Sequence, residues 1–268
     1  MMKIAWATDT HFNLAKPSKI QEFLDSVTEK RLDALFLTGD ISESQCLHQH
    51  LSRFESLGIP VYFVLGNHDY YNSSIKKTNI QLDEFVSHHQ NLKWMTREGV
   101  ILLTERTALV GCEGWWDGFY GHESQGFLHD FVMRQDYTAI KELTVSKSKR
   151  RDVLVDLAAK SIDHLKRMLQ MAFDSREEVI VLTHVPPFKE SCYIYGTEFP
   201  DNWLYHFCSN ILGVFLTNFM QMHPKKQLTV LCGHTHEPTF YRPLPNLTVM
   251  VGGASYYKPK VYTTMTIK

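Results

Sequence analysis

Six short hydrophobic runs occur along the chain, and five of them lead directly into a cluster of polar residues. The runs are rich in Val, Ile, Leu and Phe and are not interrupted by charged side chains at alternate positions. Unbroken apolar runs of this length are typical of strands in a parallel sheet that is covered on both faces. The pattern predicts strands at Lys3–Thr8, Ala34–Thr38, Val61–Leu65, Ala108–Gly111, Val179–Thr183 and Leu228–Cys232.

Longer amphipathic segments separate these runs and predict helices. The expected helices are Ser18–Lys30, Ser44–Leu57, Lys76–Gln90, Asp152–Ala172 and Trp203–Met222. The fourth has the clearest start, because Asp152 can serve as its N-cap. Strands that alternate with helices are typical of an α/β fold whose ligand sites lie at the carboxyl ends of the strands.

The C-terminal part has a different pattern. Residues Thr239–Lys268 contain two strand-like runs around a Pro-rich turn and end in an alternating run, Val261–Ile267, which predicts antiparallel strands. A mixed sheet or a two-sheet sandwich is therefore expected. The length of 268 residues is at the upper end for one domain, and the sequence has no repeat or linker, so we expect a single domain over residues 1–268.

Composition narrows the class of protein. The net charge of −1 arises from 28 basic and 29 acidic residues and argues against a basic nucleic-acid-binding surface. The five cysteines are odd in number and form no CxxC pair, which argues against a disulfide framework. The N-terminal segment has Asp9 where a secretory signal needs apolar residues, and no run of about 18 apolar residues occurs. We expect a soluble, cytoplasmic protein with no membrane partner; its oligomeric state stays open.

The polar clusters carry metal-binding side chains. They are Asp9-Thr10-His11, Gly39-Asp40, Gly66-Asn67-His68-Asp69, Thr183-His184 and Gly233-His234-Thr235-His236. Imidazoles with carboxylates and an amide, but without thiolates, are suited to a two-metal hydrolytic centre. Asp9 and His11 are two residues apart in an expected extended segment, so alternation should point both side chains the same way, as it should for His234 and His236. The two oxygens of Asp40 can bridge two ions.

These five clusters resemble the motifs of the calcineurin-like metallophosphoesterase superfamily, which are Asp-x-His, Gly-Asp, Gly-Asn-His-Asp/Glu, His and Gly-His-x-His in this order. The resemblance extends from Asp9 to His236. It implies a four-layer α/β/β/α sandwich with two mixed sheets and a dinuclear metal site at the strand carboxyl ends. It also implies two ligand sets: Asp9, His11, Asp40 and His236 for one ion, and Asp40, Asn67, His184 and His234 for the other. Such ligands favour Mn, Fe, Zn, Co or Ni over Ca or Mg, and the identity of the two ions stays open.

The resemblance implies hydrolysis of a phosphate ester by attack of a metal-bridging hydroxide. His68 is expected to act as general acid or electrostatic stabiliser, with Asp69 orienting or charging it. The Arg-Gly-Asn-His-Glu motif of protein Ser/Thr phosphatases is absent, and Glu43 stands where purple acid phosphatases have tyrosine. His184-Val185-Pro186-Pro187 is similar to the motif of small bacterial phosphodiesterases.

We therefore expect a phosphoesterase that hydrolyses phosphodiester or phosphomonoester bonds of small, nucleotide-derived substrates. The alternatives are a DNA-processing exonuclease of the same superfamily and a non-catalytic protein-binding scaffold with this fold. Trp115, Trp116 and the segment 193–203 are candidates for lining a substrate pocket, and hydrophobic packing is the alternative for them.

Overall fold

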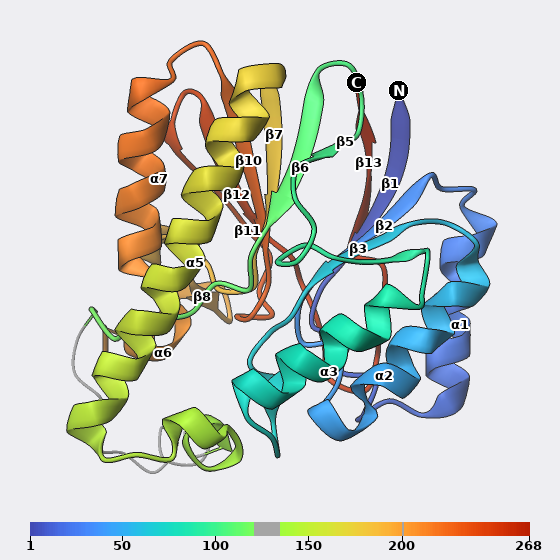
Figure 1. The fold of residues 1–268 in the computed structure, drawn as a ribbon, viewed down its shortest axis with the longest axis horizontal. Helices are drawn as coiled ribbons and strands as arrows, with labels where there is room; N and C mark the ends of the chain where they lie inside the picture. The colour runs from blue at the N-terminus through green and yellow to red at the C-terminus, as the bar shows by residue number, and fades with distance from the viewer. Residues whose placement is uncertain (121–134, 200) are drawn as a thin grey trace.

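Two large sheets form the centre of the molecule (Figure 1), a computed structural model that describes residues 1–120, 135–199 and 201–268. The five-stranded sheet has, in spatial order, β13 (Thr263–Ile267), β1 (Met2–Ala7), β2 (Ala34–Thr38), β3 (Val61–Val64) and β4 (Leu92–Trp94). The six-stranded sheet has β11 (Thr239–Leu244), β12 (Leu247–Val251), β10 (Gln227–Cys232), β7 (Glu178–Leu182), β6 (Thr107–Gly111) and β5 (Ile101–Leu102). A short hairpin consists of β8 (Tyr193–Ile194) and β9 (Thr197–Glu198).

All six strands predicted from the apolar runs are present. Strands β1 to β4 pair in parallel, as do β6, β7, β10 and β12, so the carboxyl ends of each parallel set lie at one edge of its sheet. The antiparallel strands predicted near the C-terminus are also present, with β11 beside β12. The last strand, β13, belongs to the five-stranded sheet and pairs antiparallel with β1, with Met2 opposite Ile267.

The helices differ from the predicted ones mainly at their ends. They are α1 (Pro17–Glu29), α2 (Ser44–Ser52), α3 (Ile75–Ser87), α5 (Lys147–Ser175), α6 (Asp201–Phe207) and α7 (Asn210–Met222), and α2 continues as a 3₁₀ helix, η1 (Arg53–Leu57). The start predicted at Asp152 was wrong, because α5 begins five residues earlier, at Lys147, and its first residues are Lys147-Ser148-Lys149-Arg150-Arg151. Among the described residues, no helix has both the length and the apolar character needed to cross a bilayer.

The helix predicted over 203–222 is broken into α6 and α7. At the break, Ser209 N–H donates to the carbonyl of Pro186 at 3.0 Å, and Ile211 N–H donates to Asp117 Oδ2 at 2.7 Å. These tertiary bonds replace helical ones, so the chain starts a new helix with Asp117 bound to its first turn. Periodicity alone does not report such a break, because both helices keep an apolar face.

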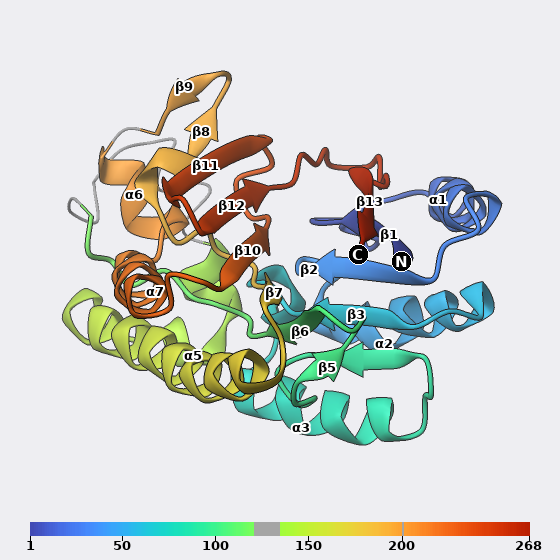
Figure 2. The ribbon, with the colours of Figure 1, turned by 90° about the horizontal axis from the view of Figure 1, so that it is seen from above.

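Side-chain alternation on the strands builds four layers. In β1, Ala5 and Ala7 pack with the cluster formed by α1, α2 and α3, whereas Ile4 and Trp6 pack against residues of the second sheet such as Leu182. The second sheet packs its other face against α5 and α7. Figure 2 shows α5 and α7 on one side and α1, α2 and α3 on the other, with the sheets between them. The expected α/β/β/α sandwich with two mixed sheets is confirmed.

Candidate metal centre

The polar clusters that follow the strands converge at one place. Backbone hydrogen bonds tie their loops together: Asp9 N–H donates to Gly39 O at 3.0 Å, His11 N–H donates to Asp40 O at 3.0 Å, and Gly233 N–H donates to His184 O at 2.9 Å. Three overlapping groups result whose ligand atoms lie within 4.8 Å of one another: Asp9, His11 and His236; His11, Asp40 and His68; and Asp40, His184 and His234.

An unusual backbone conformation produces this convergence. The φ angles of Asp9, His11, Asp40, His234 and His236 are +48°, +40°, +51°, +71° and +62°. Side chains other than glycine rarely adopt the left-handed region, and its use is concentrated at functional sites. The expectation that the paired ligands share an extended segment was therefore wrong, since left-handed turns after the strand ends aim these side chains.

Glycines make the tight packing of these loops possible. A Cβ atom on Gly39, whose φ is +88°, would lie 2.5 Å from His184 Nδ1. A Cβ atom on Gly66 would lie 2.2 Å from Asp40 Oδ1, and one on Gly233 would lie 2.2 Å from Asp9 Oδ2. Each of these glycines therefore leaves the space that a neighbouring candidate ligand occupies.

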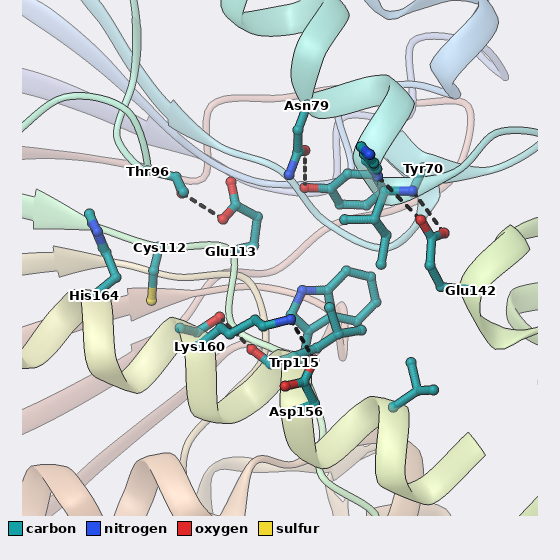
Figure 3. Close-up of a pocket in the computed structure, with 15 residues that line it drawn as sticks. Tyr70, Asn79, Thr96, Cys112, Glu113, Trp115, Glu142, Asp156, Lys160 and His164 are labelled. Carbon is teal, nitrogen blue, oxygen red and sulfur yellow. Dashed lines mark hydrogen bonds and ion pairs between the residues drawn. The ribbon is translucent and has the colours of Figure 1, made fainter. Parts of the chain in front are cut away.

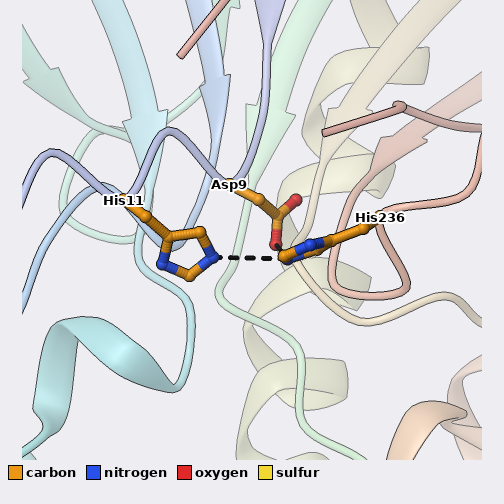
Figure 4. Close-up of side chains that lie close together, drawn as sticks. All are labelled: Asp9, His11 and His236. Carbon is orange, nitrogen blue, oxygen red and sulfur yellow. Dashed lines mark hydrogen bonds and ion pairs between the residues drawn. The ribbon is translucent and has the colours of Figure 1, made fainter. Parts of the chain in front are cut away.

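The first group has its side chains pointing toward one another (Figure 4). His11 Nε2 lies 3.3 Å from His236 Nε2, which lies 3.3 Å from Asp9 Oδ1. The carboxylate of Asp9 is held from behind, because His234 N–H donates to both of its oxygens at 3.1 Å. A bond across 225 residues of sequence thus orients one candidate ligand.

The group of Asp40, His184 and His234 adjoins the first group through Asp40. His184 Nε2 lies 3.2 Å from His234 Nδ1, 3.1 Å from Asn67 Oδ1 and 3.5 Å from Asp40 Oδ1. The other oxygen of Asp40, Oδ2, lies 3.8 Å from His11 Nε2 in the first group. Ligands bound to one ion at about 2.1 Å and at angles of 90° to 109° are about 3.0–3.4 Å apart, which is close to these separations.

The donor roles of two histidines test whether a metal ion fits. His184 Nδ1 lies 2.8 Å from Thr38 O, and His234 Nε2 lies 3.0 Å from His206 O. Because a carbonyl only accepts, both outer ring nitrogens carry a proton, and the inner nitrogens of the two rings face each other. Either a proton on His184 or a bound metal ion can lie between these inner nitrogens. The oxygens of Asp40 and Asn67 beside the pair are ligands that suit a metal ion, so the donor set fits one.

Burial and neighbouring charges shift the pKa values of the candidate ligands. Burial by itself raises the pKa of Asp9, but His236 and His184 outweigh it and lower the pKa to about 2. Burial lowers the pKa of His184, yet Asp40 and Asp9 outweigh it and raise the pKa to about 10. Burial also lowers the pKa of His11 to about 3. The carboxylates therefore stay ionised at neutral pH, and the buried negative charge calls for cations.

Asp69 makes contacts other than those expected for a partner of His68. It is fully buried, and its Oδ1 and Oδ2 accept hydrogen bonds at 2.8 Å from Ser42 N–H and Gly66 N–H. These amides belong to the loops after β2 and β3, which carry Asp40 and Asn67. The observed contacts are those of a residue that holds two ligand loops together.

His68 is oriented by residues that sequence reasoning missed. Its backbone N–H donates to Asp40 Oδ1 at 2.9 Å, and its ring stacks on Tyr71 with centroids 4.2 Å apart. The Tyr71 hydroxyl donates at 2.7 Å to Asp136, a buried carboxylate. The sequence spacing could have indicated Tyr71, because it follows His68 by three residues. The single turn of η2 (His68–Tyr70) separates the two residues. No sequence signal indicated Asp136.

Partly exposed side chains mark the open side of the centre. The side chains of His68 and His236 are 17% and 20% exposed, whereas those of His11 and His184 are 0% and 1% exposed. Tyr256 lies at the same opening, 45% exposed, with its ring 4.7 Å from those of His11 and His236. A substrate can approach past these side chains.

The two tryptophans proposed as pocket residues are buried. Trp116 stacks on His234 with centroids 5.6 Å apart, so it supports a candidate ligand. Trp115 lines a separate cavity of about 430 Å³ between α3 and α5, with Tyr70 and Glu113 (Figure 3). Hydrophobic packing was the correct interpretation for both.

Through its described residues, the segment 193–203 reaches the centre indirectly. Tyr195 at the hairpin tip is 91% exposed, and Trp203 stacks on Phe207, whose ring lies 4.9 Å from that of His234. Residue 200 of this segment lies outside the described residues. The described contacts therefore place aromatic rings behind His234, on the buried side of the centre.

The sandwich of two sheets, with aspartates and histidines gathered at the strand ends, defines a hydrolase of the metallophosphoesterase class. The sequence profile described as calcineurin-like phosphoesterase matches residues 2–238. The chain belongs to this family and is a hydrolase that acts on phosphoric ester bonds. No curated protein was found to match the sequence.

Several solved structures share the fold at low sequence identity. A dimetal phosphatase from Danio rerio has a TM-score of 0.60 and 11% identity, with 94% of this chain and 87% of that chain covered. A protein of Thermus thermophilus has a TM-score of 0.56 and 14% identity, with 94% and 89% covered. GAP50, described as the anchor in the inner membrane complex of Plasmodium, has a TM-score of 0.53 and 14% identity, with 94% and 71% covered.

Proposed function

We propose that the protein is a dinuclear metal-dependent phosphodiesterase that acts on small, nucleotide-derived substrates. One ion would be held by Asp9, His11, Asp40 and His236, and the other by Asp40, Asn67, His184 and His234. The observation that carries this proposal is the convergence of the complete ligand set around the two oxygens of Asp40, at separations that suit metal ligands. Two transition-metal ions, when bound, would supply an activated water and neutralise charge on the phosphate.

The surrounding side chains support specific roles in this reaction. Thr38 O and His206 O orient His184 and His234, so that their inner nitrogens face the centre. His68 would protonate the leaving oxygen or stabilise the phosphoryl group, since its ring nitrogen Nε2 lies 3.9 Å from Asp40 Oδ2 and on the open side.

The open side also bears on substrate class. A phosphodiester has an ester group on each side of phosphorus, so one group must extend away from the buried ligands. Tyr256 offers an exposed ring beside His236 for the second group, and an aromatic surface favours a planar base or aryl ring. This feature favours diesters with an aromatic part, and the net charge of −1 gives no general attraction for long DNA.

The proposal is tested with a metal titration and a substrate panel. The protein is stripped with chelator, and Mn, Fe, Co, Ni, Zn or Mg is added back before assay of bis(p-nitrophenyl) phosphate, p-nitrophenyl phosphate, cyclic nucleotides, single-stranded DNA and a phosphopeptide. Metal-dependent turnover that is fastest for small diesters is expected. Faster turnover of the phosphopeptide or of DNA would refute the substrate class.

A pair of variants tests the metal assignment. Asp40→Ala removes the carboxylate shared by both ligand sets, so both ions should be depleted in elemental analysis and activity should be lost. Asp163→Ala is the matched control, because Asp163 is an exposed carboxylate on α5. Full occupancy of two ions in Asp40→Ala would overturn the assignment, and two ions without hydrolysis of any phosphate ester in the wild type would support the scaffold alternative.

A further inference from the structure

A carboxylate outside the metal-binding motifs lies directly behind the centre. Asp136 is 5% exposed. Its Oδ1 accepts a hydrogen bond from Asn67 Nδ2 at 2.8 Å and another from the Tyr71 hydroxyl at 2.7 Å. A single oxygen therefore binds one candidate metal ligand and the residue that stacks on His68.

The bond to Asp136 determines which end of the Asn67 amide faces the centre. An amide has an oxygen that accepts and a nitrogen that only donates, and only the oxygen can bind a metal ion. With Nδ2 bound to Asp136, Oδ1 points to the other side, where it lies 3.1 Å from His184 Nε2. Without this acceptor, Asn67 could present either end.

The bond from Tyr71 to Asp136 likewise determines how Tyr71 meets His68. Because the hydroxyl proton is donated to Asp136, the lone pairs of the Tyr71 oxygen are available to accept. That oxygen lies 3.4 Å from His68 Nε2, and the two rings are stacked with an interplanar angle of 26°. Tyr71 can therefore hold the His68 ring by stacking and by a weak hydrogen bond.

The backbone anchors Asp136 at this place. Asn72 N–H donates to Ala139 O at 2.8 Å, and Lys141 N–H donates to Ser73 O at 3.0 Å. Ser73 and Ile140 form a parallel bridge between these bonds. The segment 135–141 thus docks on the residues that directly follow Tyr71. Backbone hydrogen bonds therefore fix the position of Asp136 beside the centre.

We propose that Asp136 is a positioning residue with two tasks: it directs the carbonyl oxygen of Asn67 toward the second ion, and through Tyr71 it fixes the ring of His68 beside the substrate. The inference rests on the proposed function, because both tasks concern groups that act there. It separates into a metal-binding arm and a catalytic arm, which different variants address.

Four variants of the full-length protein test the two arms. Asp136→Leu keeps the branched shape and the number of side-chain heavy atoms but removes the acceptor, and Asp136→Asn keeps an acceptor oxygen at the same place. Tyr71→Phe keeps the stacking and removes the hydroxyl. Lys141→Ala is the control, because its side chain is exposed on the same segment. Thermal unfolding followed by circular dichroism establishes that each variant is folded.

The first readout is the affinity for Mn²⁺, measured by equilibrium dialysis and elemental analysis. In Asp136→Leu, the affinity for one of the two ions should fall about 10- to 100-fold. In Asp136→Asn it should return to within about threefold of the wild type, because the acceptor is kept. Wild-type affinity in Asp136→Leu, or an equal loss in Asp136→Asn, would overturn the metal-binding arm.

The second readout is the steady-state rate with diesters that have p-nitrophenolate or alkoxide leaving groups. Tyr71→Phe should bind both ions normally, keep KM and lower kcat about 5- to 10-fold, with the larger loss for the alkoxide. An unchanged kcat for both substrates would overturn the catalytic arm. Failure of the proposed function would differ, since the wild type would then hydrolyse no diester while the metal affinities of the Asp136 variants still decide the first arm.

Discussion

Replacing Asp69 by alanine would test whether this residue holds the metal centre together or takes part in the chemistry. Its two oxygens accept hydrogen bonds at 2.8 Å from the amides of Ser42 and Gly66, and its side chain is fully buried. Alanine would leave both N–H groups without an acceptor in a place that water reaches poorly. The loops that carry Asp40 and Asn67 would then lose the bonds that join them.

The magnitude follows from the two lost acceptors. Each buried donor left without a partner costs about 1–3 kcal/mol, so the pair costs about 2–6 kcal/mol. Part of this is offset, because burial and the neighbouring Asp40 raise the pKa of Asp69 well above its usual range, which means that its negative charge is itself unfavourable. We expect the free energy of unfolding to fall by about 2–4 kcal/mol, a large part of the roughly 5–15 kcal/mol that is typical of folded domains.

The assay is equilibrium unfolding in guanidinium chloride, followed by tryptophan fluorescence, with metal and with chelator. Asp69→Asn is the matched control, because it keeps one acceptor oxygen and should lie between the wild type and Asp69→Ala. Metal affinity should fall along with stability. An Asp69→Ala variant within about 1 kcal/mol of the wild type, with a rate lowered about 10³-fold or more, would refute this reasoning and favour a role in orienting or charging His68.

Three further predictions address other parts of the molecule. His68→Ala should keep both ions and lower kcat about 10²- to 10⁴-fold, more for alkoxide than for p-nitrophenolate leaving groups; equal losses would contradict acid catalysis, and loss of an ion would identify His68 as a ligand. Burial raises the pKa of Glu113 and outweighs the hydrogen bonds that lower it. The stability that the protonated carboxyl contributes is therefore present below the unfolded pKa and is lost as the pH rises through the folded pKa. Glu113→Gln should therefore gain stability relative to the wild type as the pH rises above about 4.3, and parallel pH profiles would contradict this. Gly39→Ala should lose metal and about 2 kcal/mol or more of stability, because its Cβ would lie 2.5 Å from His184 Nδ1 at a φ of +88°. Gly58→Ala, at a φ of +64° with open space around it, is the control for backbone strain alone.

The sequence by itself determined the strands, the class of fold and the set of candidate ligands. Strands were predictable because runs such as Ala34–Thr38 are buried on both faces, so that every position is apolar and the signal is local. The ligands were recognisable because each motif, such as Gly66-Asn67-His68-Asp69, is short and follows a strand directly. Parallel pairing then brings the strand ends to one edge, as the positions of Asp9, Asp40 and Asn67 show.

Only the tertiary structure decided how those side chains are aimed and supported. The left-handed turns at Asp9 and His11 depend on backbone bonds to Gly39 and Asp40, which are distant in sequence. The contacts of Asp136 depend on a segment with no motif of its own docking beside Tyr71. Such contacts join positions far apart in the chain at no fixed spacing, so local sequence patterns do not indicate them. They form when buried polar groups pair with one another as the layers pack.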